Sequence, residues 1–75
     1  MTSYVTNKTK VSDVSSWEEL YSSDYATVWE ANNIYGFYKV KTAKTTKYFK
    51  GETAWMKIQS YVVDLGDYNG WYIFK

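Results

Sequence analysis

Sixteen of the 75 residues carry aromatic rings, and the chain contains no cysteine, histidine, arginine or proline. A domain of this length buries only about 60–65% of the surface that its unfolded chain exposes. Small domains often compensate with a disulfide or a bound metal, but neither cysteine nor histidine is present here. The core must therefore be built from large rings, each of which can bury on the order of 150–250 Å².

Positive charge is concentrated in one short segment, although the net charge of the chain is only +1. Residues 1–38 contain two lysines and five acidic residues, and residues 51–75 contain two lysines and three acidic residues. Residues 39–50 contain five lysines and no acidic residue. Such a cluster favours contact with an anionic partner along this segment.

The chain begins with a polar stretch. Residues 1–12 are rich in Thr, Ser, Asn and Lys, which predicts a flexible tail or an edge strand. Ser16-Trp-Glu-Glu19 then fits a capping box, in which the serine hydroxyl and the glutamate carboxylate satisfy each other's backbone donors. This motif predicts a short N-terminal helix over residues 16–22.

Strands are predicted in the middle of the chain. Residues 25–31 alternate well enough for one strand, residues 34–42 form the clearest strand, and residues 47–50 add a short one. Asn32-Asn33 and residues 43–46 provide the turns between them, the first because Asn tolerates positive φ.

The two faces of the strand over residues 34–42 differ in polarity. Its even positions are Ile34, Gly36, Tyr38, Val40 and Thr42, and its odd positions are Tyr35, Phe37, Lys39 and Lys41. Only one face can meet the core, and the lysines favour exposure of the odd face. Tyr35 and Phe37 are therefore expected in solvent, beside the lysines.

The best helix spans residues 52–65, and Gly66 follows where a helix-terminating glycine belongs. Its apolar residues recur at three- and four-residue spacing and form a core-facing stripe. The stripe contains Ala54, Ile58, Tyr61, Val62 and Leu65, with Trp55 at its flank. Residues 67–70 form a predicted turn, and residues 71–74 a final strand.

Together these elements predict a single α+β domain over residues 13–75. It combines a small antiparallel sheet of three to four strands with one long helix packed on one face and a short N-terminal helix. The side chains expected in its core are Val28, Val40, Trp55, Ile58, Val62, Leu65 and Ile73.

The composition argues against catalysis. Nucleophilic and acid–base mechanisms usually need a group that titrates near pH 7, most often histidine, and none is present. Asp67-x-Asn69-Gly70 matches part of a calcium-binding loop, but its first ligand would be Leu65 and its last would fall after Lys75. The motif is better explained as a turn, so we expect no enzyme activity, no catalytic residue, no cofactor and no metal site.

Two interpretations of the lysine-rich segment stay open. Tyr35-Gly-Phe-Tyr-Lys-Val40 resembles the aromatic strand motif of RNA-recognition domains, whose rings stack on bases, although the element order of those domains is not predicted here. Five lysines together with Tyr48 and Phe49 would suit a groove for single-stranded nucleic acid. Lysines that protect a sheet edge against aggregation would account for the same residues.

Two further stretches, Tyr48-Phe-Lys-Gly-Glu-Thr-Ala-Trp55 and Tyr61-x-x-Asp-Leu-Gly66, carry a family resemblance. Their pattern is similar to one in small uncharacterised accessory proteins of T-even-type tailed bacteriophages. The resemblance implies a compact cytoplasmic protein, made during infection, that binds and inhibits a host enzyme or a defence complex. No active site is implied.

The expected partner-binding residues are Tyr35, Phe37, Lys39, Lys41, Lys44, Lys47, Tyr48 and Lys50. A bacterial host or defence protein with an acidic surface is the favoured partner, because the net charge is near zero and arginine is absent. Single-stranded nucleic acid is the alternative, and a homodimer stays open. Without a transmembrane span or a signal peptide in the sequence, we expect no membrane partner and a cytoplasmic location.

Overall fold

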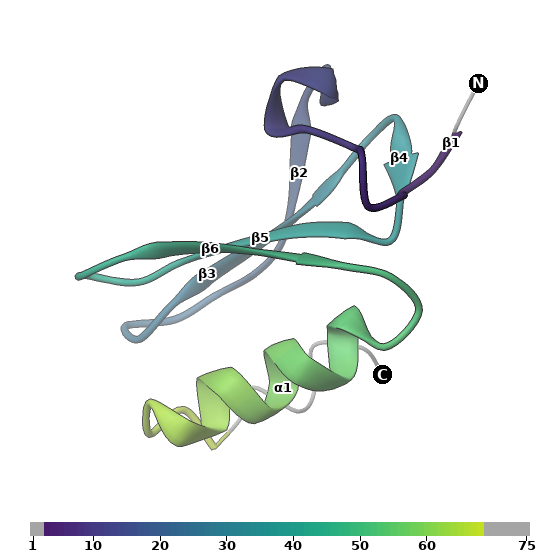
Figure 1. Ribbon diagram of the computed structural model, residues 1–75. Helices are drawn as coiled ribbons and strands as arrows, with labels where there is room; N and C mark the ends of the chain where they lie inside the picture. The colour runs from purple at the N-terminus through teal and green to yellow at the C-terminus, as the bar shows by residue number, and fades with distance from the viewer. Residues whose placement is uncertain (1–2, 69–75) are drawn as a thin grey trace.

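An antiparallel sheet of four strands, in the order β2-β3-β5-β6, is the main element of the structure. The computed structural model describes residues 3–68 (Figure 1). The sheet contains β2 (Trp17–Ser22), β3 (Thr27–Ala31), β5 (Phe37–Lys41) and β6 (Thr46–Lys50). The other elements are β1 (Ser3–Tyr4), the 3₁₀ helix η1 (Val11–Asp13), β4 (Ile34–Tyr35) and α1 (Ala54–Asp64). The α+β class, with an antiparallel sheet and one α-helix, is confirmed.

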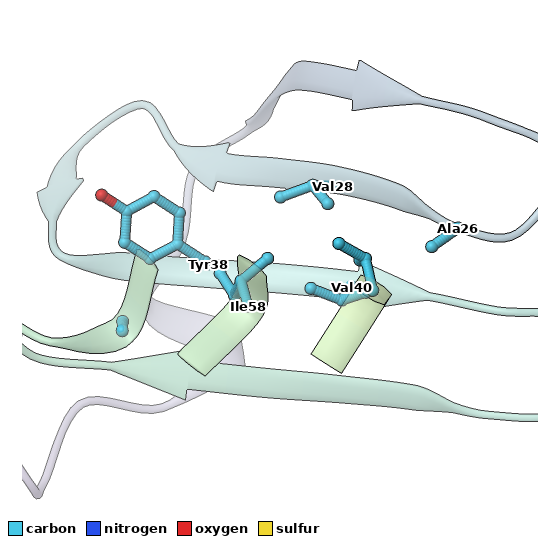
Figure 2. Packing of buried hydrophobic residues seen from close by; sticks show 7 residues of the cluster. Ala26, Val28, Tyr38, Val40 and Ile58 are labelled. Atoms are coloured by element: carbon cyan, nitrogen blue, oxygen red, sulfur yellow. The ribbon is translucent and has the colours of Figure 1, made fainter. Parts of the chain in front are cut away.

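The main core lies between α1 and one face of the sheet. Ala54, Ile58 and Val62 are spaced by four residues, so they share one side of α1, and all three are buried. Figure 2 shows Ile58 against the strands that carry Val28 and Val40, which are also fully buried. The whole cluster comprises Ala26, Val28, Tyr38, Val40, Ala54, Ile58 and Val62.

Two side chains predicted in this core lie outside it. Trp55 is 39% exposed and Leu65 is 38% exposed. Trp55 follows Ala54 directly, and neighbouring helical residues point in directions about 100° apart. Leu65 caps the C-terminal end of α1, after Val62, which is the last residue of the helix in the core. Ile73 and the strand predicted over residues 71–74 lie outside the described residues.

The predicted glycine at the end of α1 is confirmed by its geometry. Gly66 has a φ of 104°, and its N–H donates to the carbonyl of Val63 at 2.9 Å. The N–H of Asp67 donates to the carbonyl of Val62 at 3.0 Å. This pair of bonds is the Schellman arrangement, which satisfies the last helical carbonyls and turns the chain back toward the sheet.

Residues 16–22 form no helix, so the prediction based on the capping box is wrong. Residues 17–22 form β2, which pairs antiparallel with β3. Ser16 serves the neighbouring turn instead: its carbonyl accepts from the Asn32 N–H at 3.0 Å, and its Oγ accepts from Asn32 Nδ2 at 2.6 Å. Strand pairing and these turn contacts outweigh the local helix signal, because intrinsic propensity is a weak preference.

The strand predicted over residues 34–42 is divided at Gly36, whose φ is 77°. This backbone conformation shifts the alternation of side chains, so Ile34 and Phe37 join the same cluster. Ala31 completes it, and Val5, Val14 and Trp17 pack against it. In Figure 1 this N-terminal part of the chain lies across the sheet from α1.

The predicted exposure of Phe37 is therefore wrong: its exposed fraction is 0%. Phe37 does point away from the main core, as the alternation predicted, but the N-terminal segment covers it. Tyr35 is 55% exposed, in agreement with the prediction.

Candidate functional site

Rings and lysines gather on the sheet face opposite α1. The strand register places Trp29, Lys39 and Tyr48 in one row across β3, β5 and β6. Because side chains alternate along a strand, they lie on the opposite side from Val28 and Val40, which face α1. We call this surface the aromatic–lysine face, which consists of Trp17, Trp29, Lys39, Lys41, Tyr48 and Lys50.

Lys39 is at the centre of the aromatic–lysine face. Its Nζ lies 4.8 Å from the ring centroid of Trp17 and 4.5 Å from that of Trp29. Both distances fall within the range of cation–π attraction. The ammonium group is thus held between two indoles, one from β2 and one from β3.

Trp17 extends across the sheet toward β6. It is paired with Ala31, whose small side chain leaves room above β3. Its ring meets Phe37 edge-on at a centroid distance of 5.4 Å and reaches Tyr48 at 6.1 Å. Phe37 therefore serves as the buried floor of the face, while Tyr48 is 43% exposed at its rim.

Lys50 connects the face to the N-terminal segment. Its Nζ lies 5.3 Å from the ring centroid of Phe37 and donates a hydrogen bond to the carbonyl of Thr9. Lys41 is exposed at the other end of β5. The lysines consequently occupy the middle and both ends of the face.

The electrostatic balance of this surface is positive. Glu19 is the cross-strand neighbour of Trp29, so one carboxylate accompanies three lysines. Glu30 is paired with Tyr38 and lies on the α1 side. Burial raises the pKa of the Glu30 carboxyl above its ordinary value of 4.5. The pKa of Tyr38 is raised to about 12, chiefly because its hydroxyl is buried and further because of the charge of Glu30 and the hydrogen bond to it. The half-buried Glu30 therefore adds no negative charge to the aromatic–lysine face, because it lies on the other side of the sheet.

Four of the eight residues predicted from the sequence meet on this face: Lys39, Lys41, Tyr48 and Lys50. Lys44 lies in the turn between β5 and β6. Lys47 lies on the α1 side, with its Nζ 4.6 Å from the ring centroid of Tyr61. Tyr35 lies away from the face beside Tyr4, and Phe37 is beneath its surface.

Trp17 and Trp29 were missing from the sequence-based site. The capping motif places Trp17 in a predicted helix, and the predicted strand over residues 25–31 carries no expectation for the face of Trp29. The alternation of Trp29 with Val28 was the available signal, since a valine in the core places its neighbour on the other face.

Comparison with protein-family models, with curated proteins and with solved structures found no match to this chain. Within residues 3–68, no helix has the length and apolar character that crossing a membrane would require. The same part of the chain contains no group of three or more His, Cys, Asp or Glu side chains that could hold a metal ion.

Proposed function

We propose that the protein binds single-stranded nucleic acid on the aromatic–lysine face and acts by binding rather than by catalysis. The observation that carries this proposal is the row of Trp29, Lys39 and Tyr48 on the sheet face opposite α1, in which Tyr48 is exposed and Trp29 and Lys39 are half-buried. Single-strand binders combine rings that stack on bases with cations that follow the phosphates. Trp29 and Tyr48 are two strands apart, about 9–10 Å at the usual strand spacing, so they would contact different bases.

Lys39 must give up part of its contact with the two indoles when a base stacks there. A cation–π contact at an exposed site is worth about 0.5–1 kcal/mol. Stacking of one base on an aromatic side chain is worth about 1–3 kcal/mol. A base that stacks on one indole replaces the cation–π contact with that ring alone, so the exchange is favourable, and the ammonium group that moves aside can pair with a phosphate.

An acidic protein surface is the second candidate partner. The position of the Lys39 ammonium group over both indoles favours it, because positive charge then covers the rings. Trp29 and Tyr48 would be the anchors, since binding energy concentrates in such residues, and the lysines would increase the association rate. In this form of the proposal, the target is a bacterial host or defence protein that is inhibited by contact in the cytoplasm.

Anisotropy of a labelled oligothymidylate tests the first candidate. Tyr48→Ala should weaken binding by roughly 5- to 150-fold, the equivalent of about 1–3 kcal/mol for one stacked base. Tyr48→Phe keeps the ring and should bind like the original protein. No measurable binding at low salt, or equal binding by both variants, would contradict base stacking on this face.

Salt dependence separates the lysines of the face from those elsewhere. Three phosphate contacts on a single strand predict a slope of about −2 for log K against log salt. Lys41→Gln should reduce the slope by about 0.7, whereas Lys57→Gln on the exposed side of α1 should leave it unchanged.

A pull-down from bacterial lysate distinguishes the two candidate partners. One stoichiometric protein that survives nuclease treatment and is lost with Trp29→Ala would support the second candidate.

A further inference from the structure

A second aromatic site lies between the β1–β4 pair and the start of α1. Its pocket has a volume of about 410 Å³. The side chains that define its chemistry are Tyr4, Tyr35, Tyr38, Glu52 and Trp55. None of them belongs to the aromatic–lysine face, so this site is separate from the proposed nucleic-acid surface.

Backbone pairing brings the two exposed tyrosines together. β1 and β4 run parallel with Tyr4 opposite Tyr35, and the Val5 N–H donates to the carbonyl of Tyr35 at 2.9 Å. The two rings have a centroid distance of 5.5 Å and are tilted by 38°. They form one wall of the pocket.

Two glycines bring the opposite wall into position. The Gly51 N–H donates to the carbonyl of Gly36 at 3.0 Å, which fixes the loop before α1 against the end of β4. A Cβ on Gly36 would lie 3.1 Å from Val5 Cγ1, so the close approach favours glycine. Glu52 and Trp55, which follow Gly51, therefore line the same pocket as the tyrosine pair.

The lining has the chemistry of a cation site. Aromatic rings present negative faces that attract ammonium groups, and cages of such rings recognise methylated ammonium ions. Glu52 is the one charged residue among the lining side chains, and its charge is negative. A carboxylate at this position would repel an anion and would be unnecessary for a purely apolar ligand.

The exposure of the rings indicates how the cation is presented. Tyr4 is 81% exposed, Tyr35 55% and Trp55 39%, so the pocket is shallow. A free small molecule is usually buried to about 70–90% of its surface, which these walls do not provide. We propose that the pocket binds the alkylammonium group of a lysine side chain projecting from a partner protein.

A matched pair of peptides tests the charge requirement. One short peptide carries a single trimethyl-lysine, and its isostere carries a neutral tert-butyl group in place of the trimethylammonium. Tryptophan fluorescence and chemical-shift titration should give at least about 10-fold tighter binding of the cationic peptide, since removal of the charge removes the cation–π attraction. Equal binding of the two peptides, or no saturable response to either, would overturn the proposal.

Variants assign the effect to the pocket. Glu52→Gln should weaken the cationic peptide about 5- to 10-fold and leave the neutral isostere unchanged, because only the cation is attracted by the carboxylate. Trp55→Ala should abolish binding, while Tyr48→Ala, on the other site, should have no effect. If choline binds more tightly than the trimethyl-lysine peptide, a small cation is the ligand and the assignment to a protein side chain is overturned.

Discussion

Replacement of Asp67 by alanine should remove a buried connection between the end of α1 and the β2–β3 hairpin. Asp67 is only 4% exposed, and its Oδ2 accepts hydrogen bonds from the Tyr21 hydroxyl and the Ser23 Oγ, both at 2.6 Å. A hydrogen bond to a charged group contributes about 1.5–3 kcal/mol. The free-energy cost of burying the carboxylate offsets part of the stabilisation from the two hydrogen bonds. We therefore expect Asp67→Ala to lower the free energy of unfolding by about 3 kcal/mol.

This loss is large for a domain of 75 residues, whose stability should be about 4–11 kcal/mol at the usual 0.05–0.15 kcal/mol per residue. Thermal unfolding followed by circular dichroism should show a Tm lower by about 12–24 °C. Asp64→Ala is the matched control. Asp64 is exposed in the last turn of α1, where a negative charge opposes the helix dipole, so its removal should cause no loss.

A double-mutant cycle isolates the contact itself. Asp67→Ala and Ser23→Ala should be non-additive by about 1–2 kcal/mol, because residues that share a hydrogen bond couple in this range. Additivity of the two changes, or an Asp67→Ala variant that unfolds within about 0.5 kcal/mol of the original protein, would refute the argument.

Two further predictions concern the core. Ile58→Asp should unfold the domain, since an unpaired buried charge costs several kcal/mol. A circular dichroism melt unchanged from that of the original protein would reject the core assignment. Met56→Asp, on the exposed side of α1, is the matched control. The raised pKa of Tyr38, about 12 against an ordinary 10, means that the folded protein keeps a proton that the unfolded chain loses. Stability should therefore fall as the pH rises from 10 toward 12. Urea unfolding across this range should show a smaller decline for Tyr38→Phe, and an identical decline would contradict the assignment.

Where local periodicity is strong, the sequence was sufficient to predict the type and approximate position of an element. The four-residue spacing of Ala54, Ile58 and Val62 predicted a helix and its buried side, and Gly66 marked its end, but α1 spans Ala54–Asp64 and is shorter than the long helix predicted over residues 52–65. Alternation predicted strands at the positions of β3, β5 and β6. These signals work because each depends on residues that are close together in the chain.

The errors arose where distant residues decide the outcome. The capping motif at Ser16 was outweighed by pairing of β2 with β3, which no local pattern specifies. The burial of Phe37 depends on Val5 and Val14, which pack against its cluster, and the change of direction at Gly36 brings Ile34 into the same cluster. Neither effect can be read from the run of residues around Phe37 alone.

The candidate site was predicted only in part, because its residues come from different strands. The sequence identified the lysine-rich segment, but the alternation of β6 separates Lys47 from Tyr48 and Lys50. Trp17 and Trp29 reach the face from β2 and β3, so their association with Lys39 depends on the register between strands. No pattern within a single strand specifies that register.

Chemical-shift mapping with a short oligothymidylate at low salt tests the proposed binding face most directly. We predict saturable shifts of the Trp17 and Trp29 indole N–H signals and of the Tyr48 amide, which lie on the aromatic–lysine face. The amides of Ile58 and Val62 on α1 should remain in place. Shifts confined to α1, or no saturable shift at any of these positions, would contradict nucleic-acid binding on the aromatic–lysine face.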